Sequence, residues 1–161
     1  MNKKIICHDI NGGKIEVDSN KLIFSPSVYG ILIENNKILL SKQWDGYDFP
    51  GGKIEIYETI NQALKREFFE ETGITVEPIK PLLCETSFFH QTNAKENKYR
   101  NCPLIYFLVK KISGTISTKN LSKTELNYVG EAEWIDVNKI NDLKIYTPID
   151  SIKLIKHALN N

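Results

Sequence analysis

The sequence of 161 residues lacks any long run of one charge. It has 21 Lys and Arg against 20 Asp and Glu, which gives a formal net charge of +1. This balance excludes a polybasic arm of the kind that binds nucleic acid, and it excludes an acidic tail. A polyanionic ligand must therefore be bound by a local site.

The sequence also lacks an apolar segment of membrane-spanning length. The N-terminal stretch MNKKIICHDI has a three-residue apolar run, too short for the core of a signal peptide. We therefore expect a cytoplasmic protein with no membrane partner. Cysteine is scarce, and Cys7, Cys84 and Cys102 are widely separated and in no metal-ligand spacing. We expect reduced, mostly buried thiols.

No internal repeat, linker or low-complexity segment divides the chain. With 41% hydrophobic residues it is long enough to bury one core. We therefore predict a single domain over residues 1–161.

The first part of the chain is typical of β structure. Apolar-rich segments flank the turns NGG and ENN, which predicts one hairpin over 3–17 and a second over 27–43. Further strands are predicted at 82–89, 104–110 and 131–137. The polar, turn-rich segment 113–130 is predicted to be a surface loop.

Two helices are predicted. Thr59 and Gln62 fit a capping box, and Gly73 suits the end of the same helix, which should run from about 60 to 72. A second helix closes the chain, with Thr147 as N-cap and Pro148 at its first position. Strands interspersed with two helices favour an α/β layered sandwich on one mixed sheet.

The predicted helix over 60–72 carries an unusual group of acids. At 100° per residue, Glu67, Glu70 and Glu71 share the face that is apolar in the first turns. These like charges repel one another near a helix C-terminus. Arg66 can reach Glu70 or Glu58, but one cation cannot neutralise four acids. A hard divalent cation such as Mg²⁺ or Mn²⁺ would.

A run of acids on a helix is usually a solvated face. Here, however, the acids belong to a longer fixed register, which a generic acidic helix has no reason to possess. Its residues are Gly52, Glu58, Arg66, Glu67, Phe68, Glu70, Glu71, Gly73 and Ile74. This register resembles, without a departure, the Nudix box of the MutT-like hydrolases.

The resemblance implies a Nudix-type α/β/α sandwich around a mixed sheet. It also implies an enzyme that uses Mg²⁺, or Mn²⁺ in its place, to cleave the diphosphate linkage of a nucleoside diphosphate joined to another moiety. Water would attack phosphorus, activated by one of the helix acids or by a downstream acid.

The resemblance also implies a role for each matched residue. Glu67, Glu70 and Glu71 are expected to be metal ligands, together with the backbone carbonyl of Gly52. The pair Arg66 and Glu58 is expected to orient the helix acids.

Residues outside the box have weaker claims. A further metal ligand is expected from a distant segment, with Glu131 as first choice and Glu125 and Glu85 behind it. Basic side chains that could meet phosphate are Lys42 and Lys53. Trp44, Tyr47, Phe88, Phe89 and Tyr99 are candidate platforms for a base, and of these we favour Tyr47 and Phe89.

Several substrates stay open. Our first hypothesis is a small nucleotide, such as a plain or modified nucleoside triphosphate. The alternatives are an RNA 5′ end, a dinucleoside polyphosphate or a nucleotide sugar. ADP-ribose is disfavoured, because Phe88 and Phe89 stand where ADP-ribose enzymes often show a proline. A catalytically silent domain that senses nucleotides is the alternative of another class. The oligomeric state is open, a homodimer included.

Overall fold

The computed structural model describes residues 2–92, 97–122 and 125–161. In chain order the strands are β1 (Lys4–His8), β2 (Lys14–Asp18), β3 (Leu22–Phe24), β4 (Ser27–Ile31), β5 (Ile33–Glu34), β6 (Lys37–Gln43), β7 (Gly46–Asp48), β8 (Gly51–Lys53), β9 (Ile74–Thr92), β10 (Asn97–Gly114) and β11 (Glu133–Asp136). The α-helices are α1 (Ile60–Thr72) and α2 (Ser151–Leu159).

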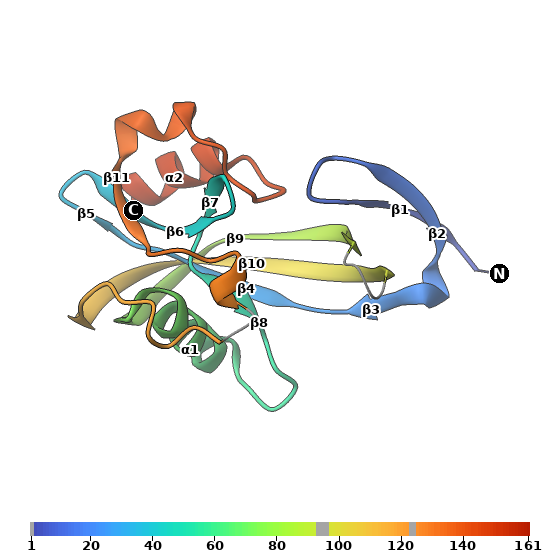
Figure 1. Cartoon of the computed structure of the whole chain (residues 1–161), viewed down its shortest axis with the longest axis horizontal. Coiled ribbons are helices and arrows are strands. Elements are labelled where there is room, and N and C mark those ends of the chain that lie inside the picture. The colour runs from blue at the N-terminus through green and yellow to red at the C-terminus, as the bar shows by residue number, and fades with distance from the viewer. Residues whose placement is uncertain (1, 93–96, 123–124) are drawn as a thin grey trace.

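The centre of the molecule is a mixed sheet. Its strands are ordered β2-β1-β9-β10-β4-β8, and β3 also pairs with β10. The pairs β1–β9, β10–β3 and β10–β4 are parallel and the others are antiparallel. Helix α1 covers one face and α2 lies on the other side (Figure 1). The predicted α/β/α sandwich is confirmed, and a smaller sheet of β11, β6, β5 and β7 is added to it.

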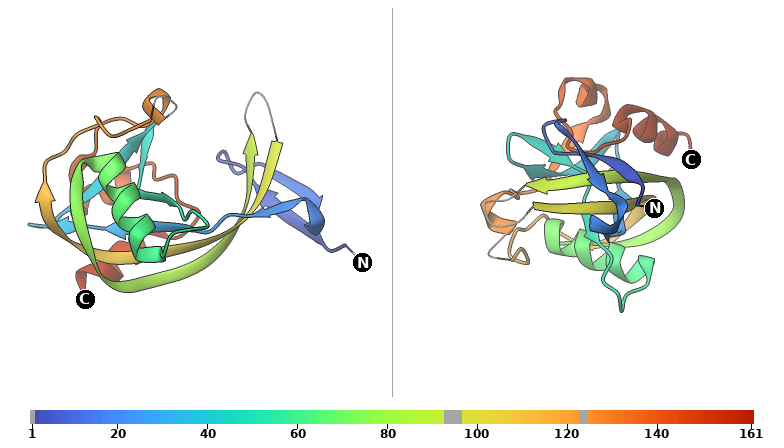
Figure 2. Two further views of the ribbon diagram at one scale, coloured as in Figure 1. Left: turned by 90° about the horizontal axis from the view of Figure 1, so that it is seen from below. Right: turned by 90° about the vertical axis from the view of Figure 1, so that its right-hand side faces the viewer.

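The predicted N-terminal hairpin is confirmed. Strands β1 and β2 pair from Lys4 with Asp18 to His8 with Lys14. The hairpin joins the sheet through His8 and Phe89. Figure 2 shows that the long strands β9 and β10 reach outward from the body to meet it. The hairpin therefore stands beside the main body of the sandwich.

The second hairpin is only partly as predicted. Asn35 and Asn36 have φ values of 50° and 59°, as a tight turn of the I′ type requires, and β5 pairs with β6 across them. However, β4 lies between β10 and β8 in the large sheet. Its interior residues are largely buried because it has neighbours on both sides. Such a strand is positioned by distant partners and not by the next turn.

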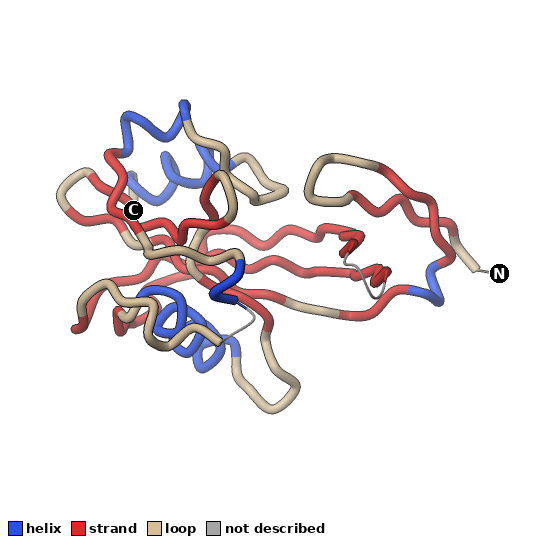
Figure 3. Tube along the Cα trace, in the orientation of Figure 1, coloured by secondary structure: helices blue, strands red, loops and turns tan. Residues whose placement is uncertain are grey.

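Helix α1 has the bounds that its sequence predicts. Thr59 and Gln62 form the capping box, and Gly73 ends the helix with a φ of 72°. Leu64 and Phe68 are fully buried in the core on this face of the sheet. The loop over 54–59 that precedes the helix projects from the body (Figure 3). These local signals fix where the acids of the last two turns stand.

Helix α2 begins later than predicted. Its N-cap is Asp150, whose side chain accepts a hydrogen bond from the backbone N–H of Lys153 at 2.9 Å. The predicted cap, Thr147, instead shares a hydrogen bond of 2.8 Å with the hydroxyl of Tyr106. Because its hydroxyl is used by the sheet, Thr147 does not cap the helix, and Pro148 lies outside it.

The remaining expectations concern loops and thiols. Strand β10 runs on to Gly114, and Leu121 and Val129 are buried, so the segment 113–130 is not wholly a surface loop; residues 123–124 lie outside the described ranges. Cys7 and Cys102 are buried, Cys84 is exposed, and all three are free. Across the described ranges, neither helix is long and apolar enough to span a membrane.

Candidate active site

The end of α1 lies against the glycine turn of β8. A Cβ atom built on Gly52 would stand 2.6 Å from Oε2 of Glu67, so any other residue would displace this carboxylate from its present position. The backbone of β8 is therefore brought close to a carboxylate of the helix. This is the arrangement in which a backbone carbonyl and a side-chain carboxylate can share one ligand.

Arg66 joins three of the predicted site acids. Its Nε and Nη2 donate to the two oxygens of Glu58 at 2.6 and 2.8 Å, a bidentate pair. Its Nη1 lies 2.8 Å from Glu67 Oε1 and 3.0 Å from Glu70 Oε2, and its Nη2 also donates to the carbonyl of Lys53 at 3.2 Å. Hydrogen bonding from Arg66 holds the pKa of Glu58 below its usual value. One guanidinium therefore orients acids from the loop and from two turns of the helix.

Glu71 has a different environment, because it is buried. Its Oε2 accepts hydrogen bonds from the hydroxyl of Ser41 at 2.7 Å and from the backbone N–H of Gly51 at 3.3 Å. Burial raises the pKa of Glu71 to about 8, and the nearby carboxylate of Asp48 acts in the same direction. Glu71 thus ties α1 to β6 and to the glycine turn.

Two polar residues of this region were missed by the sequence analysis. Ser41 bonds Glu71, and Asp48 lies opposite Ser41 in the β6–β7 pairing. Burial raises the pKa of Asp48 to about 7. The available signal was alternation: in KILLSKQ, Ser41 and Gln43 share one face of the strand, and Lys42 faces the other way.

That alternation also separates two predicted phosphate or base contacts from the acids. Lys42 Nζ donates to Glu133 Oε1 at 3.0 Å, and the hydroxyl of Tyr47 donates to Glu133 Oε2 at 2.9 Å. Both side chains lie on the face of the β6–β7 hairpin opposite Ser41 and Asp48. The structure therefore does not bring Lys42 or Tyr47 together with Glu67, Glu70 and Glu71.

Of the other predicted residues, three line a cleft and Glu131 does not. Lys53, Glu85 and Phe89 line a large cleft, and Lys53 Nζ also pairs with Glu55 at 3.1 Å. Glu131 is exposed, and among the described residues no hydrogen bond or ion pair joins it to the acids of α1. The side chain of Glu125 lies outside the described part of the structure.

The cleft has a volume of about 1370 Å³ and reaches from Asp48 and Lys53, on either side of the glycine turn, to the N-terminal hairpin. Asp48 and Lys53 belong to its lining at one end, and His8 and Ile10 of the hairpin region belong to its lining at the other. It is larger than the 300–1,000 Å³ typical of small-molecule sites. The acids of α1 are not part of this lining, but Asp48 is, and its carboxylate acts on the pKa of Glu71. An extended substrate that lies along the cleft would therefore have one end next to the site of the acids.

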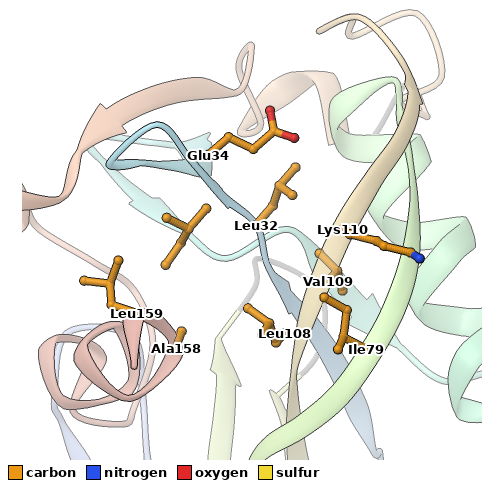
Figure 4. A pocket seen from close by; sticks show the side chains of 9 residues that line it. Leu32, Glu34, Ile79, Leu108, Val109, Lys110, Ala158 and Leu159 are labelled. Atoms are coloured by element: carbon orange, nitrogen blue, oxygen red, sulfur yellow. The ribbon is translucent and has the colours of Figure 1, made fainter. Parts of the chain in front are cut away.

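A smaller hollow of about 320 Å³ lies between α2 and the two long strands. Figure 4 shows apolar side chains such as Leu108 and Leu159 around it, with Glu34 and Lys110 also in the lining. Its lining holds no group of acids and no glycine turn. It does not have the chemistry of a hydrolytic site.

The acids fit a divalent cation by their chemistry. Carboxylate and carbonyl oxygens are the donors that Mg²⁺ prefers, and the missing side chain of Gly52 leaves Glu67 open to the β8 backbone. Glu58, Glu67 and Glu70 carry more negative charge than Arg66 can neutralise. Across residues 2–92, 97–122 and 125–161, no three Asp, Glu, His or Cys side chains converge to metal-binding distance. Arg66 contacts an oxygen of Glu67 and an oxygen of Glu70 in this structure.

Comparison with known proteins decides the family. A family model for the NUDIX domain matches residues 24–157. The chain belongs to the Nudix family. It is a Nudix hydrolase of the MutT-like kind, as its box of nine matched residues predicts.

Two relatives of this Nudix hydrolase are named for different activities. An 8-oxo-dGTP diphosphatase from Buchnera aphidicola is 32% identical over 98 residues, which cover 57% of this chain and 68% of that protein. An ADP-ribose pyrophosphatase from Methanocaldococcus jannaschii is 29% identical over 150 residues, covering 89% and 79%. A solved NUDIX hydrolase from Nitrosomonas europaea has a TM-score of 0.65 at 21% identity, covering 86% of this chain and 90% of that one, which shows the shared fold.

Proposed function

We propose that this Nudix hydrolase cleaves the diphosphate linkage of a nucleoside diphosphate joined to another moiety, using Mg²⁺ or Mn²⁺. The favoured substrate is a small nucleotide such as a plain or modified nucleoside triphosphate. The observation that supports the proposal is the Arg66 network, in which one guanidinium contacts Glu58, Glu67 and Glu70, and Glu67 lies against Gly52. We further propose a cytoplasmic location.

Each residue of the network has a defined task in this proposal. Glu67, Glu70 and Glu71, with the carbonyl of Gly52, would hold the cation. When bound, the cation neutralises diphosphate oxygens and lowers the pKa of the attacking water. Arg66 holds the carboxylates in place through Glu58, which it grips by two hydrogen bonds. One of the helix acids, or an acid from the cleft such as Glu85, accepts the proton of the water.

Binding of the cation must compete with Arg66. In the structure, Nη1 of Arg66 contacts both Glu67 and Glu70, whereas its Nε and Nη2 are engaged by Glu58. Glu58 would therefore keep the guanidinium in place if Glu67 and Glu70 bound a cation instead of Arg66.

Residues other than the acids of the box determine which substrate is bound. The two relatives act, by their names, on 8-oxo-dGTP and on ADP-ribose, so both compounds belong in the first test. ADP-ribose has a specific argument in its favour, because that relative matches 89% of this chain. An extended cleft is also compatible with a dinucleoside polyphosphate or an RNA 5′ end.

A panel of substrates tests the proposal. The purified protein is incubated with dGTP, 8-oxo-dGTP, ADP-ribose, a dinucleoside tetraphosphate and 5′-triphosphorylated RNA in Mg²⁺, and products are identified by mass. We expect a nucleoside monophosphate, or a 5′-monophosphorylated RNA, from at least one of them. Glu70→Gln should lower that turnover by orders of magnitude while leaving the melting temperature close to that of the parent. A parent that cleaves none of the panel, or a variant as fast as the parent, would contradict the proposal.

A further inference from the structure

The turn between β6 and β7 carries a tryptophan in an unusual backbone conformation. Trp44 has a φ of 45°, in the left-handed region that residues other than glycine rarely occupy. Such strain persists only where the surrounding structure holds it, and it is concentrated at functional sites. More than half of the Trp44 surface is exposed, at 53%. Packing in a core therefore does not explain why this residue is here.

The turn is held from two sides by distant segments. On one side, the backbone N–H of Trp44 donates to the carbonyl of Tyr128 at 3.0 Å. On the other side, Tyr47 exchanges backbone hydrogen bonds with Lys144 and Tyr146 at 2.9 and 2.8 Å. The position of Trp44 is thus fixed by the fold before any ligand arrives.

The indole ring is framed by two tyrosines. The ring of Tyr128 is stacked at 5.3 Å with an interplanar angle of 21°, and the ring of Tyr146 meets Trp44 edge-on at 5.0 Å. Tyr146 is held in turn by a hydrogen bond from its hydroxyl to Asp45 and by the ammonium of Lys144 at 4.6 Å above its ring. Trp44 cannot readily turn away from this frame.

This aromatic frame lines the same cleft as Asp48 and Lys53. Trp44 stands three residues beyond Ser41, which bonds Glu71, so at most about 10 Å of chain separates the two residues. A ribose and its base can cover such a span from a phosphate held at the acids. We propose that Trp44, framed by Tyr128 and Tyr146, is the platform on which the base of the nucleotide substrate stacks.

This inference rests on the proposed function and adds to it the means by which the nucleotide is held. A flat indole accepts the face of any base, and a purine covers more of it than a pyrimidine does. The platform selects for a nucleotide over a diphosphate that lacks a base. It leaves the other half of the substrate to the rest of the cleft.

Tryptophan fluorescence tests the stacking without any turnover. The chain has two tryptophans, and Trp134→Phe leaves Trp44 as the only one. The variant is titrated in Mg²⁺ with GMP, which has no diphosphate to hydrolyse, and with ribose 5-phosphate as the matched ligand that lacks a base. We expect saturable quenching by GMP and none by ribose 5-phosphate. Equal responses to the two ligands, or no response to either, would overturn the platform.

Kinetics provide a second test that does not depend on the Trp134 variant. Trp44→Ala should raise KM for the nucleotide roughly 5- to 150-fold, the range expected for one base stacked on one aromatic ring, and leave kcat close to that of the parent. Trp44→Phe should restore most of the loss because it keeps a ring. The matched control is Phe24→Ala, which removes an exposed aromatic side chain that is not among the cleft residues.

The two proposals can fail separately. If the parent hydrolyses nucleotides and Trp44→Ala has the same KM as the Phe24→Ala control, the platform is refuted and the proposed hydrolysis is not. GMP-specific quenching in a protein that cleaves nothing in the panel supports the platform and refutes hydrolysis.

Discussion

Replacing Arg66 by alanine tests whether one guanidinium holds the site together. The change removes contacts to Glu58, Glu67 and Glu70, and it leaves the Glu58 side chain, which is 9% exposed, without its cation. Removing one partner of a mostly buried ion pair costs about 2–3 kcal/mol of the free energy of unfolding when the other partner keeps its charge. We use this low range because the Arg66 side chain is 31% exposed. At about 2–4 °C per kcal/mol for a chain of this size, the melting temperature should fall by about 4–12 °C.

Lys65→Ala is the matched control. It removes the neighbouring cation of the same helix, which makes a single pair with Glu77 between side chains that are 41% and 46% exposed. Such a pair contributes about 0–1 kcal/mol. Both variants are unfolded with urea and with heat in a chelating buffer. Equal losses from Arg66→Ala and Lys65→Ala would refute the reasoning.

The dependence on pH sharpens this test. Arg66 lowers the pKa of Glu58 below its ordinary value of 4.5, so the stabilisation from this pair is fully present above 4.5 and is lost as the pH falls through the lower folded value. The difference in free energy of unfolding between the parent and Arg66→Ala should therefore have its full size at pH 7 and should decrease below pH 4.5.

Two further predictions concern the glycine turn and the partly buried Asp48 near it. Gly52→Ala would place a methyl group 2.6 Å from Glu67 Oε2 and displace that carboxylate. Turnover by the folded variant should therefore fall, and a variant with the kcat and KM of the parent would show that the close contact between Gly52 and Glu67 is not needed. Burial raises the pKa of Asp48 from 3.8 to about 7, so the stability of the parent should fall as the pH rises across that window. Asp48→Asn cannot ionise at this position. Its free energy of unfolding in urea, relative to that of the parent, should therefore rise between pH 4 and pH 8, and a difference that is constant over this range would contradict the raised pKa of Asp48.

Helix α1 could be predicted from the sequence to the residue. Its capping box, its terminal glycine and its acids are signals that act within one or two turns, so no distant contact is needed to place them. For the same reason Arg66 could be predicted to reach Glu58 or Glu70, and in the structure it contacts both.

The features that the sequence did not predict depend on distant partners. The capping hydroxyl of Thr147 is taken by Tyr106, 41 residues away, and β4 joins the large sheet because β10 and β8 flank it. Lys42 was a candidate because it ends an apolar run, yet its partner Glu133 lies in another strand. Trp44 could be named as one aromatic among five, but its strained backbone and its two tyrosine neighbours are visible only in the folded chain.

Calorimetric titration with Mg²⁺ and Mn²⁺, with and without GMP, tests the central claim most directly. We predict that the parent binds the cation and that Glu70→Gln, which keeps the shape of the side chain and removes its charge, binds it far more weakly. Absence of cation uptake by the parent under every condition, or equal uptake by both proteins, would contradict the assignment of these acids as a metal site.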